Sequence, residues 1–208
     1  MRIARFLMHG FKFAIVVLAL TLAGCGSMKP IKYYQLTYPS ESPVSEGAID
    51  AAIIVRPFET SHLYLDDKIV YGFSSPEMGT YEYQRWEEPP VELLQNALVR
   101  GLRASGKFGG VYTMRSQANG QFTLSGHLYD FKEVDGNTLV ARLNYEVHLR
   151  DRKSGFVVWT YPYNHDEPAS EKNITSFVQA MDTNVNKSAQ EVQAGLLEYF
   201  RALHPPKP

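Results

Sequence analysis

The chain has 208 residues and nearly balanced charge, with 21 lysine and arginine side chains against 22 aspartate and glutamate side chains. This balance, without a basic stripe, argues against nucleic acid as a partner and against electrostatic docking on anionic lipid. The length suits one domain with a sizeable core, and the single cysteine, Cys25, excludes a disulfide within a monomer.

Residues 1–24 have the pattern of a signal peptide. Three basic residues precede an uncharged apolar run at 13–23, and its roughly 11 residues are too few for a helix that crosses a bilayer. The run ends in Leu-Ala-Gly-Cys at Cys25, which closely resembles the lipobox of bacterial lipoproteins. The resemblance implies cleavage before Cys25 and a covalent diacylglycerol and N-acyl chain on it, with no other cofactor. The alternative is an ordinary cleaved signal with a coincidental cysteine.

The expected anchor sets the location and the reach of the mature protein. Cleavage removes three cations and no acid, so the formal net charge falls from −1 to −4. Gly26 follows Cys25, and in this class an aspartate there would suggest the inner membrane, so we expect the periplasmic face of the outer membrane. The tether after Cys25 ends at Lys32 and spans at most about 25 Å. The folded domain, expected at 33–203, therefore lies close to its membrane.

The first half of that domain predicts three strands and a helix. Aromatic or continuous apolar runs favour strands at 33–38, 51–55 and 68–73, with a polar loop between the first two. A further extended run at 80–86 leads into two acids and two prolines, which are typical of a helix start. Leucines at three- and four-residue steps then predict an amphipathic helix that ends at Ser105-Gly106.

The second half predicts a meander of strands followed by a long helix. Alternating residues indicate strands at 122–129, 139–149 and 156–161. To put both apolar sets of the first two strands on one face, their connection must have two or four residues, which Asp135-Gly136 or Gly136-Asn137 supplies. An apolar stripe then predicts a helix over about 170–203, ahead of a proline-rich tail at 204–208. The expected fold is α+β, a single antiparallel or mixed sheet with two amphipathic helices packed on one face.

A search for chemistry finds no phosphate loop, no nucleophile elbow, no zinc-binding His-Glu-x-x-His and no cysteine pair. His127 and His148 both fall on polar faces of neighbouring strands, but neither loop length places them opposite each other. Solvated histidines are therefore expected rather than a metal site. The run at Asn173-Ile174-Thr175 serves better as a helix start than as a glycosylation site in a bacterial periplasm.

Aromatic residues concentrate in the first part of the domain, and two interpretations of them stay open. They pack across strands in the core, or they form an exposed strip that meets a partner or an acyl chain. The residues concerned are Tyr33, Tyr34, Tyr71, Phe73, Tyr81 and Tyr83. Trp86 at the helix start has the same two interpretations, as a packing anchor or as a partner contact.

The order of these features resembles the family of ABC-type transport auxiliary lipoproteins. The resemblance covers most of residues 22–203, and its most specific parts are Arg85-Trp86-x-Glu88-Pro89 and the Ile-Val-Tyr run that ends at Tyr71. A longer insert between these two parts departs from the family pattern. The resemblance implies an accessory part of a lipid-trafficking machine whose core is an ABC transporter with proteins of the mammalian-cell-entry type. It carries over no catalytic residues.

The expected function is a non-enzymatic lipoprotein that docks or positions such a transporter at the outer membrane. The expected partner is a mammalian-cell-entry-type periplasmic protein. A homo-oligomer is the other expectation, because a ring suits a protein that caps a channel, although no residue demonstrates symmetry. Candidate partner contacts are Trp86, Arg85, Tyr81 and Tyr83. The alternatives are a periplasmic lipid carrier and an envelope-assembly or peptidoglycan-synthase regulatory lipoprotein.

Overall fold

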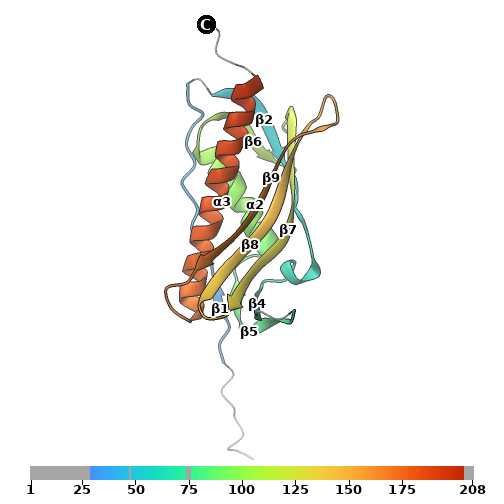
Figure 1. Cartoon of the computed structure of the whole chain (residues 1–208). Coiled ribbons are helices and arrows are strands. Elements are labelled where there is room, and N and C mark those ends of the chain that lie inside the picture. The colour runs from blue at the N-terminus through green and yellow to red at the C-terminus, as the bar shows by residue number, and fades with distance from the viewer. Residues whose placement is uncertain (1–28, 47, 74–75, 204–208) are drawn as a thin grey trace, which may run out of the picture. The chain divides into compact units, whose positions relative to one another are not determined.

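A mixed nine-stranded sheet and two long helices make up the described part of the chain (Figure 1). The computed structural model describes residues 29–46, 48–73 and 76–203. In chain order its elements are β1 (Lys32–Tyr34), β2 (Ile49–Val55), β3 (Glu59–Thr60), the short 3-10 helix η1 (His62–Tyr64), β4 (Lys68–Phe73), β5 (Met78–Trp86), α2 (Pro90–Ala104), β6 (Phe108–Thr113), β7 (Phe122–Asp135), β8 (Leu139–Asp151), β9 (Val157–Pro168) and α3 (Ile174–Leu203). The α+β prediction with a mixed sheet is confirmed.

Strand β7 is the axis of the sheet. One edge of β7 pairs along its length with β8, which in turn pairs with β9, and both pairings are antiparallel. The other edge is shared by β2, β3 and β4, all parallel to β7. Beyond them, β6 extends β2, while β5 and then β1 extend β4. The sheet therefore divides on one side of β7 into two branches that lie at opposite ends of it.

The connection between β7 and β8 corrects the predicted loop length. Asp135 pairs with Leu139, so three residues lie between the strands instead of two or four. A β-bulge at Tyr129, between the pairs Leu128–Tyr145 and Asp130–Asn144, supplies the missing shift. The buried side of β7 consequently changes from even-numbered to odd-numbered residues after the bulge.

Strands β1 and β9 differ in extent from the prediction, and strand β6 is an addition to it. Strand β1 is only three residues long, because the chain leaves the sheet after Tyr34 to run beside α3. Strand β9 continues through Pro162 to Pro168, which is possible because β9 pairs with β8 alone and a proline is tolerated on an edge strand. Strand β6 was not predicted, since Gly109 and Gly110 weaken its pattern.

Both helices pack on one face of the sheet, as predicted (Figure 1). Helix α2 begins with proline at its first turn. The start of α3 is capped by Asn173, whose Oδ1 accepts the Ser176 backbone N–H at 2.9 Å, in line with the predicted helix start. The helices meet closely at Gly101, where an added Cβ would lie 3.3 Å from the Ala189 Cβ.

A fully buried asparagine fixes α3 on the sheet. Asn184 donates through Nδ2 to the carbonyl oxygens of Ala141 on β8 and His165 on β9, at 2.9 and 3.0 Å. Its Oδ1 accepts the Tyr163 hydroxyl at 2.7 Å. A buried amide with all these partners sets the position of the helix along the strands, which apolar packing alone does not specify.

Candidate functional site

The predicted lipid attachment site, Cys25, lies outside the described residues and stays a prediction. None of the helices in the described ranges is long and apolar enough to cross a membrane. The candidate site that the structure does describe is therefore the one at 81–86, with the aromatic residues around it.

Trp86 is a core residue, so its interpretation as a partner contact is wrong. The indole has no exposed surface and packs against Phe131 of β7 and Phe177 of α3, with ring centroids 5.4 and 5.9 Å away. The indole therefore links the end of β5 to β7 and to α3. Its indole N–H has no hydrogen-bond partner within the described residues, so the contacts that hold the ring there are apolar.

Arg85 points away from Trp86 and forms a half-buried ion pair. Its Nη1 lies 2.7 Å from Oδ1 of Asp67, in the turn before β4. The Asp67 backbone carbonyl also accepts the Trp86 N–H at 2.7 Å. Arg85 therefore holds the turn before β4 against β5. Its side chain is 24% exposed, and only this exposed fraction is open to a partner.

The aromatic residues of β1, β4 and β5 divide between packing and exposure. Tyr33 is 62% exposed and Phe73 52% exposed, whereas Tyr34, Tyr71, Tyr81 and Tyr83 are half-buried. Tyr71 contacts both Phe73 and Tyr81, with ring centroids 6.0 and 4.8 Å apart. We call Tyr33, Tyr71, Phe73, Tyr81 and Tyr83 the aromatic surface. Tyr33 lies on edge strand β1 in register with Arg85, whereas Tyr71 lies in register with Glu133 on the buried side of β7, so the aromatic surface includes residues of both sheet faces. Tyr33 and Phe73 are its exposed members, and the half-buried members pack against neighbouring side chains.

A buried glutamate, which sequence reasoning missed, lies beneath this surface. Glu133 of β7 is 5% exposed and accepts the Tyr81 hydroxyl at 2.7 Å. Burial raises the pKa of Glu133, the Tyr81 hydrogen bond opposes that rise, and the nearby Asp135 charge adds to it. Burial and the Glu133 carboxylate together raise the pKa of the Tyr81 hydroxyl. The bulge at Tyr129 hides this residue from pattern reasoning, because it turns an apparently outward position inward.

The two predicted histidines lie on the polar face of β7 and β8 and do not face each other. His127 pairs with Glu146, and His148 pairs with Ser125, as expected from the strand registers. His148 Nε2 lies 3.3 Å from Oε1 of Glu146, whose pKa is lowered mainly by the hydroxyl of Tyr129. Within the described residues no group of three or more histidine, cysteine or acidic side chains is arranged to hold a metal ion.

Similarity to solved structures supports this fold. The crystal structure of protein XCC0632 from Xanthomonas campestris, of the DUF330 family, aligns with a TM-score of 0.73 at 15% identity, over 85% of this chain and 99% of that one. A second crystal structure, of an uncharacterized protein, aligns with a TM-score of 0.64 at 14% identity, over 81% and 99% of the two chains. At these identities the likeness establishes the fold alone.

The sequence itself identifies the family. Residues 34–193 match the family described as the ABC-type transport auxiliary lipoprotein component. The chain belongs to this family of transport auxiliary lipoproteins. No curated protein is similar enough in sequence to count as a match. Family membership fits an envelope protein held at a membrane by a lipid anchor.

Proposed function

We propose that this lipoprotein docks and positions an ABC transport system of the mammalian-cell-entry type at the periplasmic face of the outer membrane. The observation that carries the proposal is the family match over residues 34–193. In this role the protein catalyses no reaction, and its only non-protein groups are the acyl chains on Cys25. Lipid transport is then a property of the complete machine.

The aromatic surface is the part of the domain that we assign to partner contact. Tyr33 and Phe73 expose large apolar rings, and such rings dominate the energy of protein interfaces. Two cations near them are already paired within the chain, Arg85 with Asp67 and Lys68 with Asp66, whereas Lys32 of β1 has no ion pair with a described residue. A partner therefore gains contact energy here mainly from aromatic burial, with Arg85, Tyr81 and Tyr83 at its margin.

The expected anchor keeps this surface near the membrane. The domain begins within about 25 Å of Cys25 along the tether, and β1 lies beside β5. Three acyl chains hold a protein stably, because two or more are needed for lasting membrane binding. We expect mass spectrometry of the mature N-terminal peptide to show the acylated Cys25, and Cys25→Ser to release the protein from the outer membrane.

Crosslinking and affinity capture of the intact lipoprotein from native membranes test the proposal, with mass spectrometry of the proteins and lipids retained. Recovery of a mammalian-cell-entry-type protein supports docking. Stoichiometric lipid without such a protein would indicate a lipid carrier. Recovery of a peptidoglycan synthase or an outer-membrane assembly component would indicate the envelope-assembly alternative. Either of the last two results would overturn the proposal.

A further inference from the structure

We propose that the end of the domain farthest from β1 contains a binding site for a single acyl chain that carries an anionic headgroup. The inference does not depend on the docking role, because it concerns a different part of the sheet. The structure forms a hollow of about 790 Å³ there, between the start of β2, the start of β7, the β8–β9 turn and the end of α3. This volume lies within the range of about 300–1,000 Å³ typical of small-molecule sites.

Apolar and polar side chains both line the hollow, and Ile49, Phe122 and Phe200 form its apolar part beside Gln121. Ile49 and Phe122 are half-buried, and Phe200 at the base is 2% exposed and packs edge-on against Phe122, with centroids 4.9 Å apart. The hollow keeps its shape because strand β7 starts tightly against β2. At Gly120 an added Cβ would lie 2.7 Å from Ile54 Cγ1 and 2.9 Å from the Ala52 carbonyl oxygen. Hydrocarbon of one acyl chain matches the apolar part of this lining, since it loses its contact with water without leaving any polar group unpaired.

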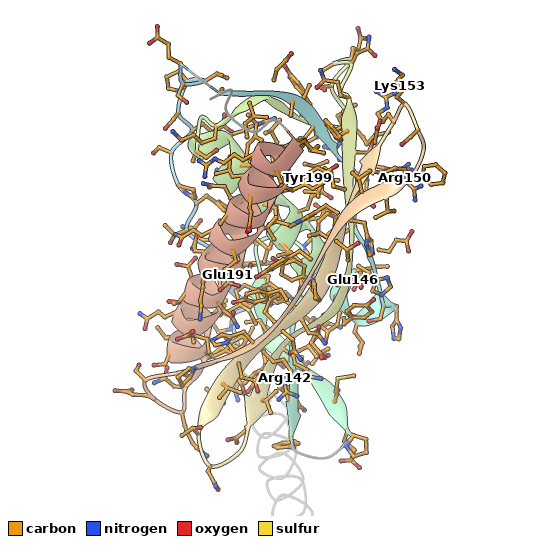
Figure 2. The ribbon with its side chains drawn as sticks, turned by 45° about the horizontal axis from the view of Figure 1, so that its top comes forward. Arg142, Glu146, Arg150, Lys153, Glu191 and Tyr199 are labelled. Atoms are coloured by element: carbon orange, nitrogen blue, oxygen red, sulfur yellow. The ribbon has the colours of Figure 1, made fainter. Side chains whose placement is uncertain are left out.

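Cations surround the opening of the hollow. Arg152, Lys153 and Arg201 are exposed lining residues, and none of them forms an ion pair with any described residue. Arg152 instead donates through Nη1 to the Gly120 carbonyl at 2.7 Å, which holds its guanidinium at the rim. Figure 2 shows Lys153 at the β8–β9 turn and Arg150 nearer the middle of the sheet, close to the end of β8.

Two carboxylates also line the hollow, and they leave the cations in excess. Asp151 is engaged within the turn, where its Oδ1 accepts the backbone N–H groups of Lys153 and Ser154 at 2.7 and 3.4 Å. Asp50 is exposed at the opposite wall. Three unpaired cations against these two acids favour a headgroup with one negative charge, such as a phosphodiester, next to the β8–β9 turn.

Photolabelling of the lipid-anchored protein in nanodiscs tests this site. The probe is lysophosphatidylglycerol with a diazirine in its chain, used below the concentration at which it forms micelles. The matched zwitterionic probe is lysophosphatidylcholine with the same chain. We expect saturable labelling by the anionic probe of peptides that contain residues 49–50, 120–122 and 151–153. Free glycerophosphoglycerol, the headgroup alone, should not compete, because the apolar walls supply most of the affinity.

Charge reversal provides the decisive variant. Lys153→Glu with Arg201→Glu should weaken labelling by the anionic probe at least tenfold and leave the weaker zwitterionic labelling unchanged. Both side chains are exposed, so the thermal unfolding midpoint should not move. The control Lys32→Glu with Lys187→Glu makes the same change in net charge at exposed positions elsewhere and should leave labelling intact. Labelling spread over the whole surface, unaffected by Lys153→Glu with Arg201→Glu, or displaced by the headgroup alone, would overturn the proposal.

Discussion

The two ends of the sheet differ in how many of their lysine and arginine side chains form ion pairs. At the end that contains β1, β4 and β5, four lysine or arginine side chains lie against acids of the same chain, in the pairs Lys68–Asp66, Arg85–Asp67, Lys132–Asp130 and Lys172–Asp135, whereas Lys32 of β1 has no ion pair with a described residue. At the end that contains the β8–β9 turn, Arg152, Lys153 and Arg201 have no ion-pair partner among the described residues. The first end therefore exposes aromatic rings among mostly paired charges, whereas the second exposes free cations around a partly apolar hollow.

Under the two proposals above, the two ends serve two kinds of recognition in one small domain. Paired charges add little attraction for a partner, so affinity at the β4–β5 end depends on Tyr33 and Phe73. Unpaired cations next to apolar walls suit an amphiphile, in which one molecule offers both a charge and a chain. The comparison leads to the following predictions, which begin with the largest expected effect.

Trp86→Ala should lower the free energy of unfolding most, because it removes a core ring at the β4–β5 end. The indole is fully buried between Phe131 and Phe177, and removal of a buried aromatic ring costs about 3–5 kcal/mol in the free energy of unfolding. Denaturant unfolding followed by circular dichroism measures this loss. The control Phe156→Ala, at a side chain that is 74% exposed, should change stability by less than about 0.5 kcal/mol. Equal effects of the two changes would contradict the assignment of Trp86 to the core.

Removal of one cation should lower the free energy of unfolding more at the β4–β5 end than at the β8–β9 end. Arg85→Met leaves the half-buried Asp67 without its 2.7 Å partner and should cost about 1–2 kcal/mol. Lys153→Met removes an unpaired, exposed cation and should cost less than about 0.5 kcal/mol. Both values come from urea unfolding at low ionic strength. A cost for Lys153→Met as large as that for Arg85→Met would show that the β8–β9 turn holds its cations by contacts that the structure does not contain.

Glu133→Gln should change the pH dependence of stability at the β4–β5 end. Because burial raises the pKa of Glu133 in the folded state, its contribution to stability is fully present below the ordinary carboxyl pKa and is lost as pH rises through the raised value. The substituted amide keeps an acceptor for the Tyr81 hydroxyl and does not ionise. The variant should therefore match the wild type in acid and become more stable than the wild type toward neutral pH.

Unfolding free energies of the wild type and Glu133→Gln, measured from pH 4 to pH 8, test this difference. Other carboxylates, such as Asp166 with its pKa lowered by Arg142, titrate equally in both proteins and cancel. A variant that is less stable than the wild type at neutral pH would mean that the Glu133 carboxylate is stabilised as an anion, contrary to the stated direction.

Tyr33→Ser with Phe73→Ser should have only a small effect on stability. Both rings are more than half exposed, so the free energy of unfolding should change by less than about 1 kcal/mol. Capture of the transport partner, in contrast, should fall at least tenfold. The matched control is Tyr129→Ser with Phe156→Ser, also one tyrosine and one phenylalanine at exposed positions. Equal capture by the two double variants would exclude a specific role for the aromatic surface.

The parts that sequence reasoning predicted are those in which one periodic signal controls the structure. The stripes of α2 and α3 and the alternation of β7 and β8 follow from burial on a single face. Asn184 interrupts the α3 stripe with a polar residue, and nothing in the pattern shows that two strand carbonyls and a tyrosine hydroxyl will satisfy it. The bulge at Tyr129 is equally invisible, because its effect appears only in the register with β8.

The candidate site was predicted only in part. Aromatic enrichment directed attention to β1, β4 and β5, but which of their rings are exposed depends on strand pairing, of β1 with β5 and of β4 with both β5 and β7. Trp86 failed as a contact because the same residue type serves both cores and interfaces. The hollow near the β8–β9 turn could not be predicted, since its lining comes from four separate elements.

Site-specific photocrosslinking in native membranes tests the docking role most directly. A photoreactive amino acid replaces Phe73 on the aromatic surface in one form of the lipoprotein and Phe156 at the β8–β9 turn in another. We predict that the Phe73 position yields an adduct with a mammalian-cell-entry-type protein and that the Phe156 position does not. The absence of such an adduct from the Phe73 position, with the lipoprotein folded and at the membrane, would contradict the proposed function.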